Sequence, residues 1–392
     1  MMRYPLPVKA GLACLMILAL TMAPMFSGTA SAISLRPISP YAVNPLVSDL
    51  PGFATFLDPF LVNPWGMVFL HGGEVLVADN GTGVATLYTR EGIPFDLIIT
   101  IPPRPGTAGP SLPTGAVLNT TSEFAVHQGG FASPALAIFA SEQGVLTGWA
   151  PDLNLTQAIV GAVGSYLPGE APRYTGLAMA IDSSGDPLLY AADSNHDRVD
   201  VYDGDWTLVG SFTDPTAHLP FTPFGIANLG NRLWVTFAPP ESDMGASFLG
   251  GEGFVDIFSA DGAFLRRFAS GGRLDFPWGV TAAPKGFVPS TNVVLIGNFG
   301  DGRINVFDAV TGNFAGQLGD EFGLPIELPG LWAIGFPSRP HFNGIPRFTD
   351  VHPPTLFFTA GIFGEEDGLF GTIRPIPRFR FPGASSSQSR LR

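Results

Sequence analysis

Side chains with oxygen ligands close short apolar segments at corresponding places along the chain. Asp79 follows Val-Leu-Val-Ala, Asp193 follows Leu-Tyr-Ala-Ala, and Asn298 follows Val-Leu-Ile-Gly. Carboxylate and amide oxygens from several segments could converge on Ca²⁺, a hard cation that takes about six to eight oxygens. A simpler explanation is that Asp and Asn at the start of a turn accept backbone N–H bonds. The sequence favours the turn, and leaves a calcium site at these three residues as an alternative.

The segment that begins at Asp193 resembles the start of an EF-hand loop without completing it. Its sixth position is Arg198, where the loop needs Gly, and its twelfth is Gly204, where a bidentate Glu is needed. We therefore expect this segment to cap a connection between strands. Apart from the candidate calcium ion, the sequence predicts no cofactor.

A second set of candidates is aromatic and occupies one recurring position: Trp65, Phe224, Trp278 and Trp332. Four such rings could form a collar that stacks a sugar or a peptide. Thr114 and Thr175 take the same position in two other units, so a collar would be incomplete. The competing explanation, which we favour, is packing between neighbouring structural units.

Motifs for covalent or acid–base catalysis are missing from the sequence. The histidines do not recur at one repeat position; they are His71, His127, His196, His218, His341 and His352. There is no His-Glu-x-x-His pair, nucleophile elbow or phosphate-binding glycine loop. The sequence therefore predicts no catalytic residue.

The recurring position belongs to a turn that ends in Gly and precedes a short apolar strand. The turns are Pro64–Gly66, Pro113–Gly115, Tyr174–Gly176, Pro223–Gly225, Pro277–Gly279 and a degenerate Leu331–Ala333. A period near 50 residues with several strands per unit indicates a propeller. We predict an all-β, six-bladed β-propeller of four-stranded antiparallel blades. We expect Gly66 and Gly279 to be required because the turn is strained.

The ends of the repeat array predict how the ring closes. Leu46–Asp49 resembles a lone outer strand, and the last unit ends at Ile373 without a fourth strand of its own. An N-terminal strand would complete the sixth blade and remove open edges. The propeller is therefore assigned to residues 33–373, with loop insertions at Pro102–Pro113, Ala238–Gly251 and Pro337–Pro354.

The terminal segments predict export. Residues 1–32 combine Arg3 and Lys9, the apolar run Gly11–Met22 and a small-residue cleavage site, as a signal peptide does. No later stretch is long enough and apolar enough to span a membrane, so we expect no transmembrane segment in the mature chain. Residues 374–392 form a basic tail for which we predict disorder. The expected location is secreted or periplasmic.

The charge of the chain limits its partners. The formal net charge is −13, and the basic tail holds five arginines and no acid, so the rest of the chain is more acidic still. Such a body repels phosphate backbones, which excludes nucleic acid as an expected partner. We expect a monomer that binds an extracellular protein or glycan.

Four segments carry a resemblance to a known family: Asn63–Gly66, Ala78–Tyr88, Gly297–Asp308 and Thr359–Ile373. They resemble uncharacterised secreted bacterial propellers that are distantly related to NHL-repeat proteins. The resemblance covers about residues 45–373 and implies the propeller fold and export. Many members carry a C-terminal PEP-CTERM tail, which this chain lacks. The family has no established activity that could be carried over.

Together these patterns predict an exported, non-catalytic propeller that binds a protein or glycan on the rim with the aromatic turns. In a four-stranded antiparallel blade, the entry turn and the loop between strands two and three share that rim. The alternative is a calcium-dependent hydrolase or lactonase with its site at the channel mouth. That reading requires the oxygen ligands of several blades to converge, and it rests on fold analogy.

Overall fold

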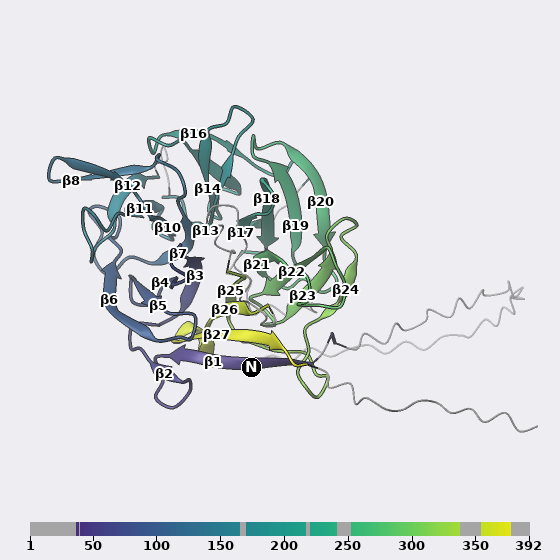
Figure 1. Ribbon diagram of the computed structural model, residues 1–392. Coiled ribbons are helices and arrows are strands. Elements are labelled where there is room, and N and C mark those ends of the chain that lie inside the picture. Colours follow the sequence, from purple (N-terminus) through teal and green to yellow (C-terminus); the bar gives the residue numbers. More distant parts are fainter. Residues whose placement is uncertain are drawn as a thin grey trace, which may run out of the picture. The chain divides into compact units, whose positions relative to one another are not determined.

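The computed structural model describes residues 37–38, 40–164, 170–216, 220–240, 252–337 and 354–377, all within the compact unit 36–392. This part of the chain is almost entirely β-structure (Figure 1). It forms six small antiparallel sheets whose first strands contact one another in succession and close a ring. The prediction of a six-bladed β-propeller is confirmed.

Five blades contain four strands in simple sequential order, from the channel outward. Their bounds are β3 (Pro64–Phe69), β4 (Val75–Asp79), β5 (Val84–Tyr88) and β6 (Pro94–Thr100) in blade 1; β7 (Pro113–Leu118), β10 (Ala137–Ser141), β11 (Val145–Trp149) and β12 (Ile159–Val163) in blade 2; β13 (Tyr174–Ile181), β14 (Pro187–Asp193), β15 (Arg198–Tyr202) and β16 (Leu208–Phe212) in blade 3; β17 (Thr222–Asn228), β18 (Arg232–Ala238), β19 (Phe254–Ser259) and β20 (Phe264–Ser270) in blade 4; β21 (Pro277–Ala282), β22 (Val293–Asn298), β23 (Ile304–Asp308) and β24 (Phe314–Gln317) in blade 5. The second and third strands are almost wholly buried, because both of their faces pack against neighbouring blades.

The sixth blade joins the two ends of the propeller. It contains β25 (Leu331–Gly335), β26 (Leu356–Gly361) and β27 (Asp367–Pro375), and β27 pairs with the N-terminal strand β1 (Tyr41–Ser48). The antiparallel register places Tyr41 opposite Pro375 and Val47 opposite Phe370. The predicted closing strand is therefore confirmed, and it is longer than the sequence indicated. We call β1 the strap. A two-residue strand, β2 (Phe56–Leu57), pairs with it in parallel and forms the sheet edge.

The recurring glycines lie where the inner strands of neighbouring blades approach most closely. A Cβ atom on Gly66 would lie 2.5 Å from the carbonyl oxygen of Thr114, and one on Gly279 would lie 2.7 Å from that of Trp332. Neither glycine has a positive φ. The expectation of a strained turn was therefore wrong. These positions need Gly because the backbone of the next blade fills the space of a side chain.

Some elements depart from the repeat. Blade 2 carries an extra hairpin, β8 (Ala125–Gln128) and β9 (Phe131–Pro134), and the loop after β26 forms the short turn α1 (Ile362–Glu365). The insertion between β6 and β7 is a loop, as predicted. Most of the other two insertions, the predicted signal peptide 1–32, residues 378–392 of the tail, and His218, His341 and His352 lie outside the described residues. Among the helices in the described part of the chain, none is long and apolar enough to cross a membrane.

Candidate functional site

The four predicted aromatic side chains meet at the channel end where the inner strands begin. Trp332 stacks on Trp65 with 3.6 Å between ring centroids, and its centroid lies 5.7 Å from those of Trp278 and Phe224. Phe299 packs against the same indole at 4.2 Å. We call these five rings the aromatic plug. They come from blades 1, 4, 5 and 6, so the plug ties together parts of the ring that are far apart in the sequence.

The side chains of the plug differ in how far they are exposed. Trp65, Phe224 and Trp332 are only 2%, 4% and 1% exposed, so their faces are used in packing. Trp278 is partly exposed and lines an open cavity. The geometry thus agrees with the packing explanation for three rings. Stacking of a ligand on these aromatics stays a prediction, with Trp278 in the most accessible position.

Polar atoms of the plug connect the blades. The indole N–H of Trp332 donates to Asn63 Oδ1 at 3.0 Å, and that of Trp278 donates to the Thr175 carbonyl at 2.9 Å. Thr114, which replaces an aromatic residue, donates its hydroxyl to the Tyr174 carbonyl of the next blade at 2.7 Å. The recurring position is therefore a linker between blades, whichever of these residue types occupies it.

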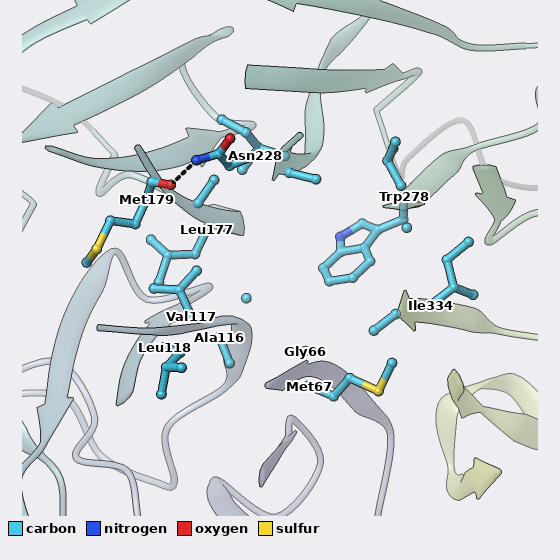
Figure 2. A pocket seen from close by; sticks show the side chains of 17 residues that line it. Gly66, Met67, Ala116, Val117, Leu118, Leu177, Met179, Asn228, Trp278 and Ile334 are labelled. Carbon is cyan, nitrogen blue, oxygen red and sulfur yellow. Dashed lines mark hydrogen bonds between the residues drawn. The ribbon is translucent and has the colours of Figure 1, made fainter. Parts of the chain in front are cut away.

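The channel continues from the plug as a cavity of about 310 Å³ (Figure 2). All six inner strands contribute to its lining: Gly66, Met67, Gly115, Ala116, Val117, Leu118, Leu177, Ala178, Met179, Ile226, Ala227, Asn228, Trp278, Gly279, Val280, Ala333 and Ile334. Figure 2 shows Asn228 bonded to the Met179 backbone, where its side-chain amide donates to the carbonyl oxygen at 2.7 Å. None of these lining residues is titratable or nucleophilic. The cavity is thus suited to binding, and its described wall offers no acid, base or nucleophile.

The predicted calcium ligands are each engaged within their own blade. Asp79 is fully buried and accepts the Thr86 hydroxyl at 2.8 Å, and burial raises the pKa of its carboxyl well above the usual range. Asn298 donates to the Arg273 carbonyl at 2.8 Å and to Asp301 Oδ1 at 2.9 Å. The Oδ1 atoms of Asp79 and Asn298 have no hydrogen-bond partner among the described residues.

Asp193 contacts a backbone N–H and a histidine side chain. Its carboxylate accepts the backbone N–H of Arg173 at 3.0 Å and lies 2.6 Å from His196 Nδ1. Burial raises the pKa of Asp193, and these two contacts oppose that shift. The three candidate calcium ligands lie in separate blades: Asp79 in blade 1, Asp193 in blade 3 and Asn298 in blade 5. Within the described ranges, no three His, Cys, Asp or Glu side chains form a group that could hold a metal ion.

Sequence reasoning missed a belt of hydrogen bonds on the plug side of the ring. Asn63 donates to Glu365 Oε2 at 2.8 Å, Asn80 donates to Glu142 Oε1 at 2.8 Å, and Arg173 Nε donates to Glu142 Oε2 at 2.9 Å. These residues come from the loops of blades 6, 1, 2 and 3. The available signal was the polar residue directly after the second strand, Asn80 and Glu142 in blades 1 and 2. We call this set the polar belt.

An ion-pair cluster in blade 4, with two buried carboxylates and a partly exposed arginine, was also missed. Arg267 Nε donates to Asp256 Oδ1 at 2.6 Å, and its Nη2 donates to Asp214 Oδ2. The guanidinium lies over the Phe254 ring, 3.6 Å from the ring centroid. Both carboxylate side chains are fully buried. Burial raises the pKa of Asp256 to about 7, although Arg267 opposes the shift. The cluster joins the outer strand β20 to the loop that leads into the blade.

Replacing Arg267 by Ala is expected to lower the free energy of unfolding by about 3–5 kcal/mol, since two buried carboxylates would lose their cation. Urea unfolding measures this loss. Arg266→Ala is the matched control, because the neighbouring guanidinium bonds to the backbone carbonyls of Ala309 and Val310 and pairs with no carboxylate in the described structure. The control should cost about 1 kcal/mol. Equal losses in both variants would argue against the ion pairs as the cause.

Comparison with known proteins gives relatives over most of the chain. The chain is 32% identical over 349 residues to the uncharacterized protein R648 of Acanthamoeba polyphaga mimivirus, covering 86% of this chain and 81% of that protein. It is 31% identical over 348 residues to the uncharacterized protein L690 of the same virus, covering 86% and 87%. No protein-family model matches the chain. The relatives are viral, so the comparisons support neither the bacterial origin nor the export that the resemblance implied.

Solved structures with a similar arrangement are distant. Virginiamycin B lyase from Staphylococcus aureus aligns with a TM-score of 0.47 and 10% identity, covering 86% of this chain and all of that one. The WD40 β-propeller domain of Doa1 aligns with a TM-score of 0.44 and 11% identity, covering 79% and 93%. Likeness at this level carries no argument about activity.

Proposed function

The chain belongs to the same family as the mimivirus proteins R648 and L690, and we propose that it is a non-catalytic binding propeller whose ligand enters the central channel. The observation that carries this proposal is the composition of the channel wall. Its described side chains are apolar apart from one partly exposed indole and one amide, its remaining polar surface is backbone, and it holds no group that could perform acid–base or nucleophilic chemistry.

The shape of the channel supports the entry of the proposed ligand from one side. The aromatic plug occupies the end where the inner strands begin, and its three most buried rings leave little surface there. The lining residues follow the inner strands away from the plug, as far as Leu118, Met179 and Asn228. A ligand therefore enters at the end opposite the plug. The proposed site therefore lies on a different rim from the one that the sequence predicted.

The chemistry of the wall favours a protein ligand over a glycan. Sugar binding relies on exposed aromatic faces together with many polar side chains. The side chains of this wall are mainly apolar, and its polar surface comes from backbone groups, the Asn228 amide and the Trp278 indole. The apolar side chains that surround Trp278 are Met67, Leu118, Met179 and Ile334. Methionine side chains adapt to irregular apolar partners. The proposed ligand is an apolar side chain presented by a protein segment. The export predicted from residues 1–32 would place the module outside the cytoplasm, and it remains part of the proposal.

The calcium-dependent hydrolase receives no specific support from the described geometry. Asp79, Asp193 and Asn298 are hydrogen-bonded inside separate blades, and burial raises the pKa of both carboxyls. The hydrolase hypothesis required the oxygen ligands of several blades to converge on one ion. The binding module is therefore the single candidate function.

Selection from a displayed library of random peptides tests the proposal. Peptides that bind the full chain are measured against Met179→Arg, which places a charged side chain in the channel, and against Val209→Arg as control. Val209 is 54% exposed on the outer strand of the same blade. We expect apolar peptides whose affinity falls at least tenfold with Met179→Arg and stays unchanged with Val209→Arg. Peptides whose binding is insensitive to Met179→Arg would overturn the channel site. The same holds if the chain binds glycans of a parallel panel but no peptide.

A further inference from the structure

A second cavity, of about 460 Å³, lies where the strap begins and β27 ends. Its lining consists of Ile38, Pro40, Tyr41, Lys285, Gly286, Phe287, Val288, Pro289, Thr291, Pro375 and Ile376. Eight of these residues are apolar or aromatic, and Lys285 is the only charged one. We call this space the strap cavity. It belongs to blades 5 and 6 and shares no lining residue with the central channel.

The walls of the strap cavity are held in place by hydrogen bonds. The Tyr41 hydroxyl donates to the Phe287 carbonyl at 2.7 Å, and Ile376 N donates to the Pro40 carbonyl at 3.0 Å. Ile38 N donates to the Gln317 carbonyl at 2.6 Å. Phe287 and Val288 are 2% and 4% exposed and pack into the core between blades 5 and 6. The cavity is thus preformed, and a ligand would not have to order a loop in order to bind.

The charge at the strap cavity is opposite to that of the chain. Lys285 is the only lysine beyond residue 9 in a chain with 33 acidic residues. It is exposed, and within the described residues it makes no ion pair. An acidic protein would readily pair a lone ammonium with one of its carboxylates. The ammonium of Lys285 instead remains available beside an apolar cavity.

We propose that the strap cavity binds an amphiphile with an apolar chain and a single carboxylate. The apolar chain of the ligand fills the space against Ile38, Pro289 and Ile376, and the carboxylate pairs with the Lys285 ammonium. The Thr291 hydroxyl, also in the lining, supplies a second donor. A dianionic phosphate fits less well, because the lining contains one cation and no arginine to bind it in a bidentate manner. The chain as a whole is acidic and repels anions, and Lys285 is the one cation among the described lining residues.

Titration calorimetry of the full chain with decanoate tests this inference, with decanol as the neutral probe. We expect decanoate to bind more tightly than decanol. Lys285→Glu should weaken decanoate binding about tenfold, because it replaces an attractive charge by a repulsive one, and should leave decanol unchanged. Arg232→Glu is the matched control, since it reverses another exposed cation on blade 4. It should change neither affinity.

Three results would overturn the inference. Absence of decanoate binding is the first. Equal binding of decanoate by the wild type and Lys285→Glu is the second, because it would mean that the carboxylate is not recognised. The third is binding that appears only after residues 378–392 are removed, which would make the chain's own tail the occupant. The channel proposal is unaffected by any of these, since Met179→Arg tests it at a separate cavity.

Discussion

A chain that begins at Pro51 is expected to show no cooperative unfolding transition above ambient temperature. This truncation removes the strap and leaves the edge of β27 unpaired between Leu369 and Pro375. It also removes Tyr41, Leu46 and Val47, which are 3%, 5% and 0% exposed. Burial of three such side chains contributes about 5 kcal/mol or more, a large part of the stability of an ordinary domain.

Circular dichroism during heating measures this effect, and a chain that begins at Pro37 is the matched control. The control keeps Ile38 and Tyr41, whose backbone N–H groups bond to Gln317 and Gly319 in blade 5. It should unfold at the same temperature as the full chain. If the chain beginning at Pro51 melted where the control melts, the strap would not be what holds the ring closed.

Replacing Gly66 by Val is the second change with a large expected effect, a loss of about 3 kcal/mol or more in the free energy of unfolding. The new Cβ would meet the Thr114 carbonyl oxygen at 2.5 Å and the Ala116 nitrogen at 2.7 Å. Both atoms are backbone atoms of the next blade, so neither can turn aside as a flexible side chain would. The strain is relieved only if two inner strands move apart.

Gly210→Val separates this mechanism from a general effect of losing glycine. Gly210 lies in the exposed outer strand β16, and a Cβ atom there would meet nothing within 4 Å. Since Val favours extended backbone, the control should be neutral or slightly stabilising in urea unfolding. A small loss for Gly66→Val would refute the close approach between blades. A comparable loss for Gly210→Val would point to a backbone effect common to both sites.

The repeat made most of the fold predictable because each blade is a local unit. Pro64–Gly66 and its counterparts mark the inner strands, and the alternating segments after them form the outer strands within the same stretch of chain. The strap was predictable for a related reason, since the unit that ends near Ile373 lacked a fourth strand. The hairpin β8–β9 broke the period and escaped notice. So did the turn at Phe363 and Glu365, whose φ values of 54° and 69° no propensity indicates.

The candidate site was less predictable, because it depends on which loops of different blades face each other. The sequence placed Trp65, Phe224, Trp278 and Trp332 at one position, and the structure brings them together. Three of these side chains bury one another. This burial depends on the width of the ring of blades, which the inner glycines set through contacts between blades. Likewise, the Asn63–Glu365 bond of the polar belt joins residues 302 positions apart. No local pattern reports such a pairing.

The position of the strap has a consequence for how the protein is made. Ser48 donates its hydroxyl to the Gly368 carbonyl, a partner 320 positions later in the chain. During synthesis, the strap must therefore wait without its partner until β27 has left the ribosome. Contacts of such long range are slow to form, because the entropy of closing the intervening loop opposes them. The early blades can form one by one, whereas the ring can close only after β27 has been translated.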